Sequence, residues 1–579
     1  MKLHILNKVL GLGIIALGIT ACTDGNDWST DASKSRMFSV SSNDISIVRY
    51  MTELDITFTP VKGAEAYTLE ISRDTLYDEI EEGATATSQV IYLTPAEAKD
   101  TIRVKDLKKD TRYYVRVRTI ASDKAPSKWS YYKDSRNRYY IKTKAEQLFS
   151  TAKYFAQTVI RPTDLFQDHL QLRWKKDEGS ETAAVDHIVV SNGSQEIASI
   201  PLSDTDKTNR LCVINYADYG LAYNTTYNFR IYNGDDKRGE LNVTTPKALP
   251  AGTHILDTDA GETLETLITS ATADIVIGIP ATAADAETPS DDALSISAIT
   301  IPDGVSVTLI GLPGGVPRIL SFTKPINING THNLIRFENV QINDGGCQYL
   351  INQGSGFTIG SIEFDNVRIP AMSRSLFRLN TSEQCTLNKL LLENIYVESQ
   401  GGGGYALLYA NKSNYTIKEV YLNNSTLSNM VHSFIDFRNA NVESINVNNV
   451  TFYNIIGSDK YFIDAQNSLP IYNINNSIFA KTNNKNAKGI RDLNTEKKDD
   501  EGKSLYFTYT FGTCYMTSDF VFKTDAAAEK PEWAGRPFYA GNNVPASTKI
   551  MKDPKNGDFT ITDNTVEGGD PRWIQPNDD

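Results

Sequence analysis

Two aspartates and an arginine form the sequence pattern best suited to chemistry. Asp436 and Asp464 are 28 residues apart, and each follows a phenylalanine and an isoleucine. Carboxylates at equivalent positions of adjacent repeats repel each other unless one binds a proton, a cation or an arginine. Together with Arg438, they predict either a Ca²⁺ site for an acidic glycan or an acid–base pair with the arginine as substrate anchor. The structural alternative is a self-neutralising Asp–Arg ladder on an exposed sheet.

Tyrosines in the same region form a second candidate surface. Tyr405 and Tyr461 fall at matching places two repeats apart, Tyr409 is nearby, and Arg378 matches Asp436 two repeats earlier. Because aromatic rings offer flat apolar faces with a polar edge, these residues are candidate contacts for sugar rings. The alternative is that the tyrosines pack between coils without binding any ligand.

Several familiar reactive patterns are missing from the sequence. Four cysteines beyond Cys22 show neither a CxxC pair nor zinc-ligand spacing to histidine. The four glycines 401–404 precede no Lys-Ser/Thr and no helix, so they are not a phosphate loop. The sequence also lacks the Asp-Asp and Gly-His-Gly pattern of polygalacturonases and the Arg-x-Pro-x-x-Arg of one pectate lyase family. We therefore favour binding over cleavage.

A repeat of 25–30 residues positions these side chains. In each copy an apolar-x-apolar-x-Asn run is followed by apolar residues in the opposite phase. Alternate residues of a strand face opposite sides, so a straight strand would turn the apolar residues after the asparagine away from the core. The chain must therefore bend at the asparagine, which tolerates the left-handed conformation that such a bend needs. Stacked asparagine amides can also hydrogen-bond from coil to coil. The corner residues are Asn339, Asn366, Asn394, Asn424, Asn449 and Asn476.

This period predicts a solenoid, and leucine-rich repeats are excluded because their leucine scaffold is absent. We expect a right-handed parallel β-helix over residues 249–579, ending in a C-terminal cap. A second strand recurs once per coil and carries the aspartates and tyrosines. The polar segment 481–503 is interpreted as a surface loop.

Residues 37–248 show period-2 alternation and turn residues instead. A Thr-x-Tyr-x-apolar-x-apolar run occurs at Thr111–Val117 and again at Thr225–Ile231. Residues 37–145 and, more loosely, 146–248 resemble fibronectin type III domains, although Phe58 stands where that family usually has a core tryptophan. The predicted fold class is thus all-β, with two fibronectin type III-like sandwiches followed by the β-helix.

The first residues predict export. A basic start and an apolar run over residues 9–19 match a signal peptide, and Ile19-Thr20-Ala21-Cys22 resembles a bacterial lipobox. We expect a signal peptide over residues 1–21, lipidation of Cys22 and a tether over 22–36. The net charge of −13 argues against a nucleic-acid partner.

The whole chain resembles surface lipoproteins of Bacteroides-type bacteria, including its end at Gly568-Gly569-Asp570-Pro571-Arg572-Trp573. The resemblance implies an outer-membrane lipoprotein facing the cell exterior, beside glycan transporter components. The expected function is binding of a complex polysaccharide, such as pectin or another acidic glycan. One alternative is a polysaccharide lyase or glycoside hydrolase, and a second is an adhesin or structural surface protein.

Overall fold

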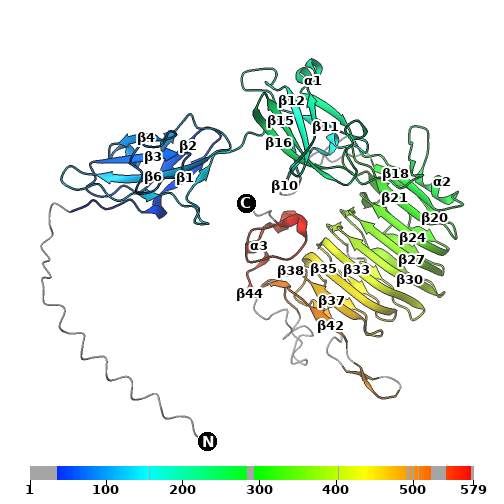
Figure 1. Cartoon of the computed structure of the whole chain (residues 1–579). Coiled ribbons are helices and arrows are strands. Elements are labelled where there is room, and N and C mark those ends of the chain that lie inside the picture. Colours follow the sequence, from blue (N-terminus) through cyan, green and yellow to red (C-terminus); the bar gives the residue numbers. More distant parts are fainter. Residues whose placement is uncertain are drawn as a thin grey trace, which may run out of the picture. The chain divides into compact units, whose positions relative to one another are not determined.

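The computed structural model describes residues 35–154, 157–282, 293–401, 403–491, 496–498, 501–505, 507–522 and 543–574. The chain divides into two units at residues 147 and 148, and strands dominate both (Figure 1). The predicted signal peptide, Cys22 and the predicted tether up to residue 34 lie outside the described residues.

The first unit is a sandwich of two antiparallel sheets. One sheet contains β1 (Ser46–Arg49), β2 (Leu54–Thr57) and β5 (Ile102–Val104). The other contains β4 (Gln89–Leu93), β3 (Ala66–Ser72), β6 (Arg112–Ile120), β7 (Ser130–Tyr131) and β8 (Ile141–Lys142). In β6, Tyr113, Val115 and Val117 point into the core, and the Tyr113 hydroxyl accepts a hydrogen bond from the Lys108 amide at 2.8 Å. This corner is typical of such sandwiches.

The same sandwich contains a fully buried ion pair. Nε and Nη2 of Arg116 donate to Glu70 Oε2 at 2.9 and 2.7 Å, and both side chains are 0% exposed. The Trp129 ring lies 4.1 Å from the Arg116 guanidinium. Because a buried charge is stable only when paired, either residue alone would be strongly destabilising here.

A second sandwich begins the second unit and has a similar strand pattern. Its smaller sheet pairs β11 (His169–Arg173) with β14 (Leu211–Asn215). Its larger sheet contains β13 (Gln195–Pro201), β12 (His187–Asn192), β15 (Thr226–Asn233) and β16 (Asp236–Thr244). The Tyr227 hydroxyl accepts from the Ala222 amide at 2.8 Å, as Tyr113 does from Lys108 in the first sandwich. The structure confirms the two predicted fibronectin type III-like sandwiches.

Short elements join these sheets. They are the hairpin β9 (Ala152–Tyr154) and β10 (Gln157–Val159), the helix α1 (Asp204–Asn209), and the helix α2 (Leu264–Thr269) at the start of the solenoid. Leu264 and Ile268 of α2 belong to the solenoid core, so this helix covers apolar residues of the first coils.

The rest of the second unit is the predicted parallel β-helix, in which three strands recur per coil and each pairs with its equivalent one coil away (Figure 1). The first sheet contains β18 (Ile275–Ile279), β21 (Val307–Gly311), β24 (Gly330–Glu338), β27 (Phe357–Asp365), β30 (Cys385–Glu393), β37 (Ile471–Asn475) and β42 (Tyr509–Phe511). The second contains β19 (Ala293–Ile296), β22 (Ile319–Phe322), β25 (Gln341–Asp344), β28 (Arg368–Ile369), β31 (Tyr396–Val397), β38 (Ile478–Thr482) and β43 (Tyr515–Thr517). The long bent strands β33 (Tyr415–Ser428) and β35 (Asn441–Ile455) run through both sheets.

The third sheet carries the candidate site. It contains β20 (Ile299–Ile301), β23 (Ile326–Ile328), β26 (Tyr349–Gln353), β29 (Ser375–Leu379), β32 (Leu408–Tyr409), β34 (Ile435–Asp436), β36 (Tyr461–Asp464) and β39 (Lys488–Ile490). Strand β39 lies inside the segment that we interpreted as a loop, and Ile490 is 0% exposed. That interpretation is wrong because the polar composition of the segment hides a short strand with one core residue.

Left-handed asparagines form the corners between the first and second sheets. All six repeat asparagines have φ between 47° and 56°. Their side-chain amides bond along the solenoid from Asn366 to Asn339 at 2.8 Å, from Asn394 to Asn366 at 3.1 Å and from Asn449 to Asn424 at 2.9 Å. Between Asn394 and Asn424 the row is interrupted, because the Asn424 amide donates to Glu393 instead.

The C-terminal segment closes over the outside of the second sheet. Here α3 (Ser547–Ile550), β45 (Met551–Asp553) and β46 (Asp558–Ile561) pack in one apolar cluster with outward side chains of the solenoid. The last turn then binds four coils, and we call it the C-terminal clasp, residues 569–573. Gly569 donates to Asn476 O, the Asp570 amide to Thr451 Oγ1, Trp573 Nε1 to Thr426 Oγ1, and Arg572 Nη2 to Asn394 Oδ1. Arg572 therefore occupies the point at which the asparagine row is interrupted.

Asn366 allows the two roles of a corner asparagine to be separated. We expect Asn366→Ala to lower the free energy of unfolding by about 1–3 kcal/mol, because it loses two amide hydrogen bonds and must hold a left-handed φ. Asn366→Gly loses the same bonds but adopts positive φ freely, so we expect a smaller loss. Urea unfolding of both variants measures the difference, and equal losses would show that the left-handed conformation has no cost at this corner.

Candidate functional site

The outward face of the third sheet brings four of the predicted site residues, Arg378, Tyr409, Asp436 and Asp464, into one row. Strand register aligns Asn352 with Arg378, Arg378 with Tyr409, Tyr409 with Asp436, and Asp436 with Asp464. One coil later, Arg491 follows Ile490, which is the register partner of Ile463. The row arises because parallel coils stack equivalent residues directly above each other.

The register differs by one residue from the predicted alignment in the coil that contains Tyr405. Tyr409, and not Leu408, stands in line with Arg378 and Asp436. Leu408 pairs with Ile435, and Ile435 with Ile463, so Tyr461 aligns with Ser433 and Tyr405 falls one place earlier than expected. The step from Arg378 to Tyr409 is 31 residues (409 − 378) and the step from Tyr409 to Asp436 is 27 (436 − 409), and the longer step contains the glycine run at 401–404.

An arginine forms an ion pair with each of the two aspartates. Arg438 Nε donates to Asp436 Oδ1 at 2.9 Å and lies 3.7 Å from Asp464 Oδ2. Arg491 Nη1 donates to Asp464 Oδ2 at 3.0 Å. The described residues contain no group of three or more acidic, histidine or cysteine side chains arranged to hold a metal. The geometry thus favours the ion-pair ladder for Asp436 and Asp464, with guanidinium groups where a Ca²⁺ ion would otherwise supply the positive charge.

Two buried polar groups next to this ladder have unused hydrogen-bonding capacity. His432 is 6% exposed, and neither of its ring nitrogens has a partner in the protein. Asp464 is 3% exposed, and its Oδ1 also lacks a partner. Burial lowers the pKa of His432 to about 4, and the positive charge of Lys460 adds to this effect. Burial raises the pKa of Asp464, which the nearby Arg491 opposes. At neutral pH His432 is therefore a neutral ring with one donor and one acceptor to offer.

These groups line a hollow of about 540 Å³ on the third sheet, which we call the third-sheet hollow. Its lining includes the three predicted tyrosines, the buried His432, Asp436 and Asp464, and the cations Arg438, Lys460 and Arg491. Tyr405 and Tyr409 meet edge to face with ring centroids 5.0 Å apart. The hollow therefore combines three aromatic rings with buried polar atoms that lack partners, and polar groups that converge on a concave surface can fix the orientation of a ligand.

The sequence patterns did not indicate Arg491, Lys460 or His432, which all line this hollow. Arg491 follows the strand hidden in the polar segment, and Lys460 precedes Tyr461 in a turn. His432 has no recognised motif around it. Its position four residues before Asp436 was the available signal, but only the fold shows that its ring nitrogens lack partners.

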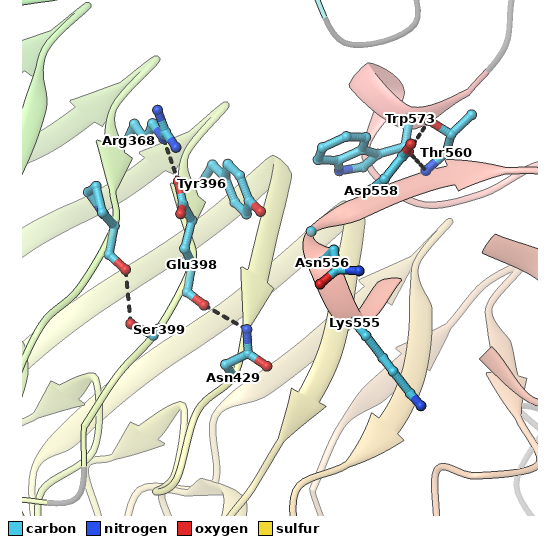
Figure 2. Close-up of a pocket in the computed structure, with 12 residues that line it drawn as sticks. Arg368, Tyr396, Glu398, Ser399, Asn429, Lys555, Asn556, Asp558, Thr560 and Trp573 are labelled. Carbon is cyan, nitrogen blue, oxygen red and sulfur yellow. Dashed lines mark hydrogen bonds and ion pairs between the residues drawn. The ribbon is translucent and has the colours of Figure 1, made fainter. Parts of the chain in front are cut away.

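A second hollow, of about 640 Å³, lies between the solenoid and the C-terminal cap. Figure 2 shows Arg368 and Tyr396 on solenoid strands, with Glu398 just after β31, facing Asp558 and Trp573 of the cap. Trp573 is only 4% exposed and its indole N–H is bonded to Thr426, while Arg368 pairs with Glu398. The large aromatic residues of this second hollow, Tyr396 and Trp573, pack against each other and hold the cap in place. We therefore consider the third-sheet hollow the better candidate for a ligand site.

The remaining sequence predictions concern cysteines and the membrane. Cys212, Cys347, Cys385 and Cys514 are buried thiols that form no disulfide. Burial raises their pKa values, to about 11 for Cys385 and Cys514 and to about 12 for the other two, so they are poor nucleophiles. None of the helices that the structure describes has the length and apolar composition of a membrane span.

Comparisons with known proteins give likenesses to solved structures alone. No family model and no curated protein matches the chain. A segment of two fibronectin type III domains from chicken tenascin matches 36% of this chain and 98% of its own length, at 11% identity and a TM-score of 0.18. The FN1–FN3 domains of chicken CNTN1 match 38% of this chain and 70% of their own length, at 12% identity and a TM-score of 0.15.

His432 makes the stability of the solenoid sensitive to acid. The unfolded histidine takes up a proton below about pH 6.5, whereas the folded one does so only near pH 4. The unfolded state therefore binds more protons in this window, and stability falls as the pH is lowered from about 6.5 to 4. We expect wild type to lose about 3 kcal/mol more than His432→Asn across this range, measured by urea unfolding.

Asp464 acts in the opposite direction, because its pKa is raised in the folded state. Since both proteins contain Asp464, its effect cancels in the comparison. Parallel stability curves for wild type and His432→Asn would contradict the assignment of a buried neutral histidine.

Proposed function

We propose that the protein is a lipid-anchored protein of the outer membrane, exposed at the cell exterior, that binds a complex polysaccharide in the third-sheet hollow. The observation that carries this proposal is the buried His432 ring without a protein partner for either nitrogen. An unsatisfied buried polar group costs about 1–3 kcal/mol, and sugar hydroxyls are both donors and acceptors. A bound sugar would satisfy His432 and Asp464 Oδ1 together.

The surroundings of His432 suit a sugar chain. Tyr405, Tyr409 and Tyr461 line the same hollow, and tyrosine rings present an apolar face to a sugar ring with a hydroxyl at the edge. Because the hollow lies on a lateral face formed by β32, β34 and β36, a long polymer can extend beyond it along the sheet. Glycan transporter components of the same membrane are the proposed protein partners, on the basis of the sequence resemblance.

Glycan retention tests this proposal directly. We expect the purified chain to be retained in affinity gels by at least one polysaccharide from a panel of plant and host polymers. Tyr409→Ala and His432→Phe should each weaken retention about tenfold or more, because each removes a sugar contact. Tyr421→Ala is the matched control, since Tyr421 is half-buried on the first sheet, away from the hollow. No retention on any polymer, or equal losses in the control, would contradict the proposal.

Asp464 supports one second candidate function, cleavage of the bound polysaccharide. A buried carboxyl with a raised pKa and a neutral histidine that line the same hollow resemble an acid–base pair. However, Arg438 donates to Asp436 and Arg491 donates to Asp464, so both carboxylates are already engaged by arginines of the protein. We therefore expect a retained polymer to be recovered at unchanged length, without new reducing ends or unsaturated uronate absorbance. Products that disappear in Asp464→Asn, with binding kept, would instead establish an enzyme.

A further inference from the structure

Two arginines stack against two tyrosines at the border of the third-sheet hollow. The Arg378 guanidinium lies 5.0 Å from the ring centroid of Tyr349 and 4.7 Å from that of Tyr405. Arg374 lies 5.5 and 5.9 Å from the same two rings. We call these four residues the arginine–tyrosine cluster. Tyr405 belongs to both the cluster and the lining of the hollow, so the two sites are continuous.

Neither arginine of the cluster is neutralised. Arg374 Nη1 donates to the Tyr349 hydroxyl at 2.7 Å, and Arg378 Nη1 donates to Asn352 Oδ1 at 2.8 Å. Both acceptors are uncharged, and no carboxylate among the described residues lies within 4.0 Å of either guanidinium. Arg378 Nε is buried and has no partner at all. This contrasts with Arg438 and Arg491, which both pair with aspartates.

The cluster therefore gives this face an excess of positive charge. The charged groups that line the hollow balance, with Asp436, Asp459 and Asp464 against Arg438, Lys460 and Arg491. Arg374 and Arg378 add two positive charges beside it, in a chain whose net charge is −13. Two uncompensated guanidinium groups that contact the same two tyrosine rings repel each other, and an anion bound by both would reduce that repulsion.

The backbone around the cluster is built to hold Arg374 against the hollow. A Cβ added to Gly403 would lie 2.1 Å from Arg374 Cγ, so the arginine stem passes directly over this glycine. The buried Gln400 amide donates to the carbonyls of both Arg374 and Tyr405, at 2.7 and 2.8 Å, and so ties the two strands together. Gly403 thus makes room for the Arg374 side chain.

We propose that the arginine–tyrosine cluster binds an acidic group, a carboxylate or a sulfate, on the polysaccharide whose adjoining sugars occupy the third-sheet hollow. This inference rests on the proposed function and specifies its substrate class as an anionic glycan. Arginine suits the task because its planar fork of N–H groups matches the paired oxygens of both anions. Stacking on the tyrosines fixes the plane of each fork before the ligand arrives.

The test compares one polymer in its charged and neutral forms. We expect polygalacturonate to bind the full-length chain at least about tenfold more tightly than its fully methyl-esterified form. The affinity should decrease as ionic strength increases, because salt screens the charge pairing. A sulfated galactan and its desulfated form provide the second arm. If polygalacturonate shows the larger ratio of charged to neutral affinity, the bound group is a carboxylate. If the sulfated galactan shows the larger ratio, the bound group is a sulfate.

Variants assign the effect to the cluster. Arg374→Gln/Arg378→Gln should reduce the ratio of charged to neutral affinity to near one, and this ratio is the readout whatever the variant does to the affinity for the neutral polymer. Lys418→Gln/Lys549→Gln is the matched control, because it removes the same charge from β33 and α3 and should keep the ratio. Arg378→Lys keeps the charge but loses the planar fork, so we expect an intermediate ratio. It provides an independent readout if the double variant does not fold.

The outcomes separate the two proposals. Equal binding of charged and neutral polymers, or a ratio that survives in Arg374→Gln/Arg378→Gln, would overturn the anion site and leave glycan binding in the hollow standing. A ratio lost equally in the lysine control would also overturn it, by showing a non-specific charge effect. No retention on any charged or neutral polymer would overturn the proposed function itself.

Discussion

Each coil of the solenoid hydrogen-bonds along its strands to the coil before it and the coil after it, and this stacking constrains everything else. Since register is fixed, a residue type that recurs once per coil becomes a row on the surface or a column in the core. The inward columns are apolar and form one continuous core from Leu256 to Phe522. The outward row through Arg378, Tyr409, Asp436 and Asp464 is the candidate site. Coil geometry thus determines which chemistry is brought together.

The fold class was predictable because the same sequence pattern, and with it the same structural requirement, recurs in six repeats. Six phase slips at asparagine specify six bends, and the structure has a left-handed residue at each. The site was less predictable because it depends on where repeats deviate. The extra length near residues 401–404 moves Tyr409 into the row and Tyr405 out of its expected place. Arg491 follows a three-residue strand inside a polar segment, where local composition carries no sign of it.

Charge pairing distinguishes structural arginines from those that remain available. Arg116 is fully buried and pairs with Glu70, and Arg336 contacts Glu338, Glu363 and Asp365 on the first sheet. Arg438 and Arg491 pair in the same way within the hollow. Against this background, Arg374 and Arg378 differ in having neutral partners. Sequence alone could not separate these groups, because pairing across coils depends on residues 25 or more positions apart.

The C-terminal clasp changes how the solenoid should hold together as a whole. In a simple repeat array each coil interacts only with its neighbours, so the terminal coils can fray independently. Arg572 bonds to Asn394, and Gly569 to Asn476, so the last residues of the described chain span the coils between those corners. Fraying of any of these coils would break contacts made by the others. The clasp therefore converts a linear array into a closed cooperative unit, which cannot form during synthesis until residues 569–573 have been added to the chain.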